Sequence, residues 1–442
     1  MSWLVAFLIV GIGGVLAFKR SSWLVDYMVV VHVFNRGLRR LLDWEAGAFD
    51  RLSPISLSPL LVGGLMLLPF LQRFHFLPKP HKTICGCLLA ALAYSFVIGF
   101  FRVQLAAVYA LAEALTPVAV LGYILTSDNS QNVKDRWIRS VSWCAILASL
   151  YGWFQYLTIP PWDAFWVTEV GFIGYLGILE PTKMTVFSTM AERGILASFL
   201  AFAVVPMIIS PKWRTVCSWA GVILVFSVIL LTLSRGGIII ATMSVFIYLL
   251  VNRGANKGPI IAGMVILMAA AWFGLGRLPG AERITTRFES LGNMKEDGSF
   301  KGRSELTSLG LSQTLSNPIG YGMGATGIAG RINTGSLEGQ AASVDAGYFD
   351  IMATYGFLGG GLFFYAMWRI WKQLALYYRA GYRPEQVMLA RAFMIALIPA
   401  TMAGNFLNGF SLLWVVFGSA LCPWSFQRFQ RKRVAGRANE TN

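Results

Sequence analysis

Arg235 is the sole charged side chain between Val216 and Val251. That stretch is about twice the roughly 20 residues that one helix needs to cross a bilayer. We therefore expect two membrane-spanning helices joined by a tight turn at Ser234–Gly237. An arginine held at a membrane boundary is energetically costly, and its planar guanidinium suits bidentate contacts with phosphate oxygens. The alternative is a snorkelling arginine that anchors the hairpin.

Composition places the chain among membrane proteins with many spans. Hydrophobic residues make up 56% of it, charged residues 13%, and the mean hydropathy is +0.60. The net charge of +16 could suggest a nucleic-acid partner. However, the basic residues fall in short connections between apolar runs and in the C-terminal tail, as in the cytoplasmic segments of membrane proteins. We therefore expect no nucleic-acid partner and a location in the bacterial inner membrane. The cysteines and histidines are scattered, so we expect neither a disulfide framework nor a metal site.

Apolar runs extend over most of the chain, and no strand alternation stands out. We therefore expect an all-α polytopic fold that forms one integral membrane domain over residues 1–442. The fold should have about 12 transmembrane helices, give or take one. The runs are 3–18, 21–35, 56–72, 83–101, 103–126, 139–158, 194–210, 215–233, 236–252, 259–276, 347–371, 387–404 and 406–424.

Basic connections set the expected orientation. The segments that should face the cytoplasm are 127–138, 211–214, 253–258 and 372–386. Those that should face outward are 159–193, 234–237 and 277–346. The basic segment Arg36–Arg40 then falls outside, against the positive-inside rule. Either an early run is re-entrant, or this segment is an amphipathic interfacial helix.

The outward segment 277–346 is too long for a simple connection, and such loops are usually functional or disordered. We interpret it as a periplasmic loop containing short helices, one of them near residues 303–314. Asn317–Gly324 resembles a dinucleotide loop only superficially, because no strand precedes it. We interpret it as a glycine-rich turn whose backbone amides approach a ligand or another loop, with a simple turn after a helix as the alternative.

Several polar residues are expected at the same outward face as Arg235. Arg193 opens an apolar run after an outward loop, and Arg303 begins the expected loop helix. Each could instead be a snorkelling residue, but three arginines on one face favour a shared anionic ligand. Asp345 stands where the long loop meets the next apolar run. It is either a helix N-cap or a base for a sugar hydroxyl.

Four motifs, in their order and spacing, carry a family resemblance: Leu233–Gly237, Gly302–Arg303, Asn317–Gly322 and Asp345–Gly359. They resemble those of the O-antigen ligase and Wzy-type polysaccharide polymerase superfamily. The resemblance implies a GT-C-like membrane glycosyltransferase that uses no cofactor, nucleotide sugar or metal. It also implies donors and acceptors that are glycans linked to undecaprenyl diphosphate. The ligase branch carries a histidine in the long outward loop. This chain has no histidine after His81, which favours a polymerase.

The resemblance and the residues together suggest roles for individual side chains. Arg193, Arg235 and Arg303 would hold the lipid diphosphate, and Asp345 would orient or deprotonate the acceptor hydroxyl. The remaining expected substrate-binding residues are Gly320, Gly322 and Tyr348.

The expected reaction is polymerisation of exopolysaccharide, capsule or O-antigen repeat units. A chain-length-regulating co-polymerase is a candidate partner. Ligation of the glycan to lipid A or protein is the first alternative. A flippase or transporter is the second, although the two halves of the chain show no repeat.

Overall fold

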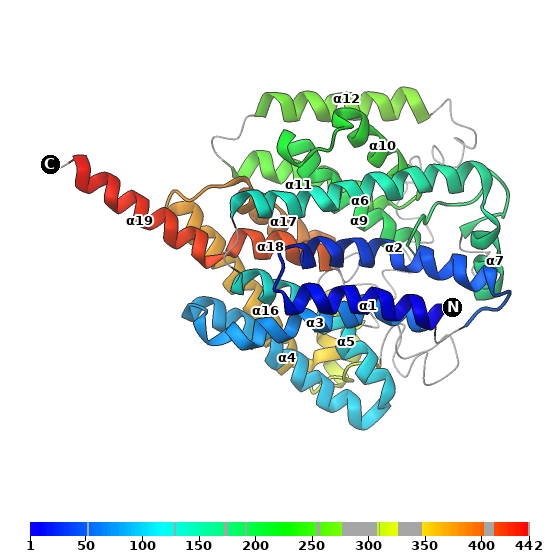
Figure 1. Ribbon diagram of the computed structural model, residues 1–442, viewed down its shortest axis with the longest axis horizontal. Coiled ribbons are helices and arrows are strands. Elements are labelled where there is room, and N and C mark those ends of the chain that lie inside the picture. Colours follow the sequence, from blue (N-terminus) through cyan, green and yellow to red (C-terminus); the bar gives the residue numbers. More distant parts are fainter. Residues whose placement is uncertain are drawn as a thin grey trace. The chain divides into compact units, whose positions relative to one another are not determined.

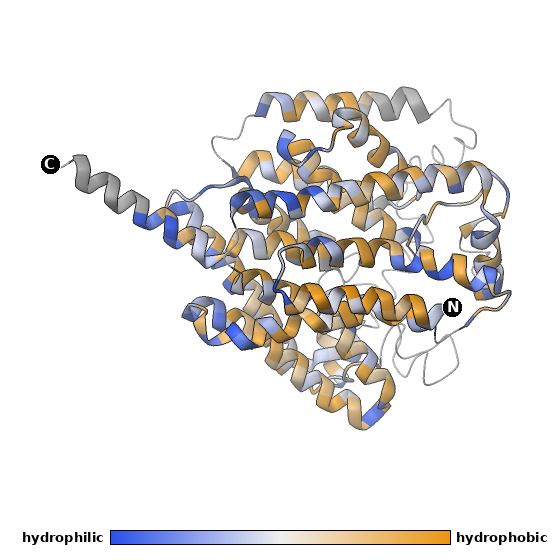
Figure 2. Cartoon of the chain, viewed as in Figure 1, coloured by the Kyte–Doolittle hydropathy of each residue, from blue (hydrophilic) through white to orange (hydrophobic). Residues whose placement is uncertain are grey.

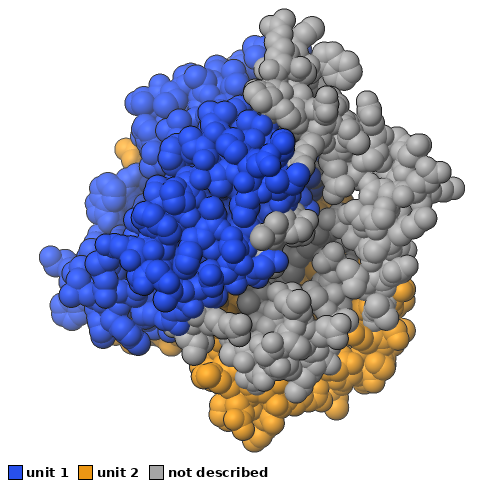
Figure 3. All heavy atoms as spheres, turned by 90° about the vertical axis from the view of Figure 1, so that its right-hand side faces the viewer, with its two compact units in different colours: residues 1–62, 135–297 blue, residues 63–134, 298–442 orange. Residues whose placement is uncertain are grey.

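A computed structural model describes residues 1–50, 53–127, 130–171, 176–190, 192–252, 257–275, 307–308, 310–325, 347–401 and 411–440. The chain divides into two compact units (Figure 3). Unit 1 comprises residues 1–62 and 135–297, and unit 2 comprises residues 63–134 and 298–442. The described part of each unit is helical, and among the described residues the only β-type pairing is an isolated bridge between Gly177 and Met184.

Each of the predicted apolar runs corresponds to a helix (Figure 1). Unit 1 contains α1 (Ser2–Phe18), α2 (Trp23–Glu45), most of α6 (Gln131–Thr158), α7 (Pro161–Val170), α9 (Arg193–Ile209), α10 (Ser218–Leu231), α11 (Arg235–Val251) and α12 (Lys257–Leu275). Unit 2 contains most of α3 (Ser58–Arg73), then α4 (Lys79–Val103), α5 (Leu105–Thr126), α16 (Gly347–Arg379), α17 (Glu385–Ala400), α18 (Ser411–Leu421) and α19 (Pro423–Glu440). Short 3-10 helices lie at Pro54–Leu57, Phe74–Phe76 and Pro211–Trp213.

Four helical segments in the described part of the chain are long and apolar enough to cross a membrane. They are Pro54–Phe76, Lys79–Val103, Leu105–Thr126 and Gly347–Arg379. Shorter apolar helices include α1, α9 and α10. Hydrophobic residues cover most of the helix lengths, whereas hydrophilic residues gather near helix ends, as at the start of α6 (Figure 2). The described residues are thus largely helical, and their apolar helices indicate a membrane protein. The total of about 12 spans, the single domain and the GT-C-like arrangement stay predictions.

The stretch around Arg235 forms two helices, as predicted, but the turn between them lies slightly earlier than expected. That both helices span the membrane stays a prediction. Helix α10 ends at Leu231 and α11 begins at Arg235, so the turn is Thr232–Ser234. Leu233 takes a positive φ of 53°, which reverses the chain direction without a glycine. The glycines after Arg235 therefore belong to the first turn of α11 rather than to the connection.

The basic segment Arg36–Arg40 is helical, as one of the two expected forms requires, and its position at the membrane interface stays a prediction. It is the continuation of α2, which runs as one helix from Trp23 to Glu45 and packs against α7. Arg39 pairs with Asp43 one turn later, and Arg40 pairs with Asp163 of α7. Two of its positive charges are thus neutralised inside unit 1, which accounts for a basic segment at this position.

Candidate functional site

Arg193 and Arg235 begin two helices of unit 1 that pack together. A Cβ atom at Gly237 of α11 would lie 2.9 Å from the Cβ of Ala197 and 3.0 Å from its carbonyl oxygen in α9. Glycine is therefore needed at this contact. Arg235 precedes Gly237 by two residues, and Arg193 precedes Ala197 by four. Both arginines consequently lie within about one helical turn of the same contact.

The two helix starts share properties that favour an anion. Neither has a side-chain hydrogen bond capping it, and neither has an acidic residue in its first turn. The first amides of a helix lack partners within the helix, and the helix dipole adds partial positive charge there. Arg193 itself is half-buried and follows the extended residue Glu192. Adjacent helix starts that each carry an arginine suit phosphate oxygens in principle. The N-cap of α9 is the acidic residue Glu192, and the assignment of Arg193 and Arg235 to diphosphate binding stays a prediction.

A buried ion pair fixes the chain segment just before Arg193. The Nε atom of Arg40 lies 3.0 Å from Oδ1 of Asp163, and the two side chains are 1% and 0% exposed. The Arg40 guanidinium also donates to the carbonyl oxygen of Met190 at 2.8 Å and to that of Ser188. It lies over the ring of Phe187, 4.8 Å from the centroid. Arg40 thereby ties α2 to residues 187–190, which lead into α9.

Asp163 and Gln155 complete this network. The other carboxylate oxygen of Asp163 accepts hydrogen bonds from the Tyr151 hydroxyl at 2.8 Å and from Nε2 of Gln155 at 2.6 Å. Gln155 in turn accepts from the backbone amides of Phe187 and Ser188 at 3.0 and 2.8 Å. Burial raises the pKa of the Asp163 carboxyl, although Arg40, Tyr151 and Gln155 act to lower it. Backbone groups of Phe187, Ser188 and Met190 are thus bonded by side chains from α2 and α6, which Asp163 of α7 holds in place.

The predicted glycine-rich turn is present in unit 2 and meets α16 where that helix is broken. Gly356 has φ 66° and ψ −178°, which interrupts the hydrogen-bond pattern of α16. The glycine-rich turn supplies hydrogen bonds in place of those lost within α16. The amides of Tyr321 and Gly322 donate to the carbonyls of Ala353 and Thr354 at 2.7 and 3.0 Å, and Phe357 donates back to Pro318 at 2.8 Å. The turn thus approaches other backbone segments, one of the two roles expected for it.

Gly320 and Gly322 are suited to this contact by their lack of side chains. Their φ values are +92° and +85°, a region that favours glycine. A Cβ at Gly320 would lie 2.4 Å from the amide nitrogen of Gly356, and one at Gly322 would lie 2.2 Å from that of Gly99 in α4. Arg102, near the end of α4, donates to the Gly320 carbonyl at 3.2 Å. The glycines fix the loop, and their assignment to substrate binding stays a prediction.

Tyr348 lies in the first turn of α16 and connects it to α17. Its hydroxyl donates to the carbonyl oxygen of Ile398 at 2.7 Å, and the amide of the preceding Gly347 donates to that of Thr401 at 2.7 Å. Tyr348 is half-buried, so part of its ring remains accessible. Arg303 and Asp345 lie outside the described residues, and so does most of the predicted loop 277–346. Within that loop, residues 307–308 and 310–316 are helical, close to the helix expected near 303–314.

One comparison with known proteins gave a match to a family model. The family model described as O-Antigen ligase matches residues 220–364. The match covers less than half of the chain, and this part of the chain is similar to the O-antigen ligase family. This confirms the resemblance that the four motifs predicted, since all of them fall inside the matched range. A search of curated proteins gave no match to the chain. Members of this family are glycosyltransferase-like membrane enzymes that act on lipid-linked glycans, so a lipid-linked glycan is a plausible substrate here.

The matched range of the O-antigen ligase family begins after Arg193 and after the whole network around Arg40. Sequence reasoning identified Arg40 only as part of a basic segment, and it did not consider Asp163 or Gln155. The sequence does carry one signal, because a basic pair in a segment expected to face outward suggests that acidic partners lie nearby. The interpretation of the sequence also gave Arg102 no role, although Arg102 is the one basic residue between two apolar runs.

Proposed function

We propose that the protein is a polymerase of oligosaccharide repeat units linked to undecaprenyl diphosphate. It would act at the periplasmic face of the bacterial inner membrane and build an exopolysaccharide, a capsule or an O-antigen. The observation that carries the proposal is the pair of arginines at the adjacent starts of α9 and α11. The O-antigen ligase family match supports a lipid-linked glycan as the substrate.

The proposed chemistry follows from the leaving group. An acceptor hydroxyl oxygen forms a bond to the anomeric carbon of the donor sugar, and the bond from that carbon to the lipid diphosphate breaks. The electron pair leaves with the diphosphate, which gains negative charge. Cations fixed at that position stabilise the charge as it develops, and such preorganised groups contribute several kcal/mol in other enzymes. A single displacement of this kind inverts the anomeric carbon without a metal ion.

Five of the predicted residues have a place in this scheme. Arg193 and Arg235 hold the diphosphate, and Arg303 covers it from the outward loop. Asp345 accepts the proton of the acceptor hydroxyl or orients that hydroxyl. Tyr348, three residues further along the chain, contacts a sugar with its ring.

Ligation of the finished glycan to lipid A or protein is the second candidate function. The description of the matched family model favours it. The absence of histidine after His81 favours the polymerase, since the ligase branch carries a histidine in its outward loop. The two functions use the same donor and differ only in the acceptor.

A reconstituted reaction distinguishes them. Purified protein is incubated with lipid-linked repeat units, with or without lipid A, and the glycan products are sized. A polymerase gives a ladder of lipid-linked chains from repeat units alone. A ligase gives no ladder and transfers glycan only when lipid A is present. Movement of lipid-linked glycan across liposome membranes without any new glycosidic bond would indicate a flippase and reject both enzymes.

A further inference from the structure

One exposed face runs along α16 in unit 2, apart from the break at Gly356. Exposed positions recur every three or four residues, which places them on one side of a helix. The face changes character along its length. It begins apolar at Leu358 and Gly361, becomes aromatic at Tyr365 and Trp368, and then carries basic groups at Lys372 and Arg379. Leu376 lies between these two basic residues.

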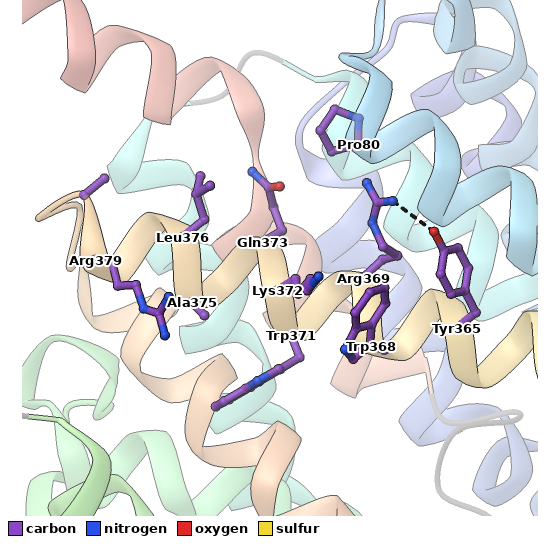
Figure 4. Close-up of a pocket in the computed structure, with 11 residues that line it drawn as sticks. Pro80, Tyr365, Trp368, Arg369, Trp371, Lys372, Gln373, Ala375, Leu376 and Arg379 are labelled. Atoms are coloured by element: carbon purple, nitrogen blue, oxygen red, sulfur yellow. Dashed lines mark hydrogen bonds between the residues drawn. The ribbon is translucent and has the colours of Figure 1, made fainter.

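The basic part of this face borders a groove of about 1010 Å³ (Figure 4). Its walls come from α16 and from Pro80 near the start of α4. Three cations line it: Arg369, Lys372 and Arg379. No acidic residue lines it, and none of the ion pairs found among the described residues involves these three side chains. The groove therefore has an excess of positive charge.

Aromatic rings hold two of the cations in place. Arg369 donates to the hydroxyl of Tyr365 at 3.1 Å, shown by the dashed line in Figure 4. The Nζ atom of Lys372 lies 3.9 Å from the ring centroid of Trp368. A cation over an aromatic face keeps its charge available for an anion on its other side. Because Arg369 and Lys372 are three residues apart on a helix, one phosphate can reach both.

Along the exposed face of α16, apolar residues are followed by aromatic and then basic residues. A phospholipid has the same order, from its acyl chains through the interfacial region to its phosphate. From Leu358 to Trp368 the helix rises about 15 Å, roughly half the hydrocarbon thickness of a bilayer. Aromatic residues then mark the level of the membrane interface, and basic residues follow at the level of lipid phosphates. The connection 372–386 is one of the segments predicted to face the cytoplasm. Basic pockets between transmembrane helices on that side favour anionic headgroups.

We propose that this groove binds an anionic phospholipid, with its phosphate between Arg369 and Lys372 and an acyl chain along Tyr365 and Leu358. The proposal stands apart from the glycosyltransferase function, because it concerns the opposite end of α16 from Tyr348. A general aromatic and basic anchor, with no preferred lipid, is the competing explanation.

Native mass spectrometry of detergent-purified full-length protein tests the proposal. Phosphatidylglycerol and phosphatidylcholine are titrated separately, and the dissociation constant of the first bound lipid is compared. Phosphatidylglycerol should bind more tightly. The double variant Arg369→Gln/Lys372→Gln should bind phosphatidylglycerol on the order of 30-fold more weakly, since each surface cation contributes roughly a factor of five.

The matched control is Lys19→Gln/Arg431→Gln, which removes the same charge from two exposed positions outside the groove. It should retain nearly all of the affinity. Equal binding of the two lipids, or an equal loss in the control variant, would overturn the proposal. Displacement of phosphatidylglycerol by millimolar inorganic phosphate would reassign the groove to a free anion and also reject the lipid.

Discussion

Replacing Asp163 by asparagine should destabilise the protein by about 3–5 kcal/mol, the usual cost of breaking a buried ion pair on one side. The Arg40 and Asp163 side chains are 1% and 0% exposed, so water cannot take over the role of the lost carboxylate. Arg40 would remain as a buried cation with only carbonyl groups and rings around it. At roughly 1.4 kcal/mol per tenfold change, the folded-to-unfolded ratio should fall by at least a hundredfold.

The assay is equilibrium unfolding in mixed detergent micelles. Lys183→Gln is the control, because Lys183 and Glu180 form a shorter contact of 2.6 Å but are each 54% exposed. Such exposed pairs contribute about 0–1 kcal/mol. The double variant Arg40→Met/Asp163→Leu should be more stable than Asp163→Asn, because it leaves no unpaired charge. If Asp163→Asn costs no more than the control, the pair does not hold unit 1 together in the way described.

Three further predictions concern the site, the glycine loop and pH. Arg235→Lys should abolish glycan product while leaving the amount of protein in the membrane unchanged, because an ammonium group cannot make bidentate contacts with phosphate. A product yield equal to that of the wild type would remove Arg235 from the mechanism. Gly322→Ala should strongly reduce the yield of folded protein on size-exclusion chromatography, because its Cβ would meet the α4 backbone at 2.2 Å. Gly361→Ala, which meets nothing within 4 Å, should leave that yield unchanged, and similar yields for both would contradict the loop contact. In Arg40→Met, Asp163 loses its cation while burial still raises the carboxyl pKa above the unfolded value. The free energy of unfolding of this variant should therefore be greatest at acid pH and should fall as the pH rises through the folded-state pKa of Asp163. A rise in the free energy of unfolding over that range would show that the folded-state pKa of Asp163 is lowered instead.

Hydropathy predicted the helices that coincide with apolar runs, because burial in lipid imposes an apolar composition over a whole run. It did not predict α7 or α19, which lie almost wholly outside those runs. It also predicted that the stretch around Arg235 forms two helices, since a single helix of that length would extend far beyond the bilayer. The break between α4 and α5 was expected near Arg102, and it occurs at Gln104, whose φ is 42°. Local composition is sufficient for features of this kind.

Long-range polar pairing was not predictable in the same way. Arg40 and Asp163 are far apart in the sequence, and each resembles an ordinary boundary residue until α2 and α7 are packed together. The break of α16 at Gly356 was also missed. A glycine inside an apolar run has several possible roles, and only the neighbouring loop shows which one applies. Arg303 and Asp345 lie outside the described residues, and their roles stay predictions.

The glycine loop divides the long polar connection before α16 into two parts. Residues 317–325 are held by backbone bonds to α4 and α16, and Gly347 is held by the end of α17. The chain between Ala325 and Gly347, which contains Asp345, therefore starts and finishes at fixed points of the same unit. Doubling the length of such a tether costs only about 0.6 kcal/mol in closure entropy. Insertions there would leave both attachment points intact, so the length of this stretch can change without altering the bonds that hold α4, α16 and α17 at its two ends.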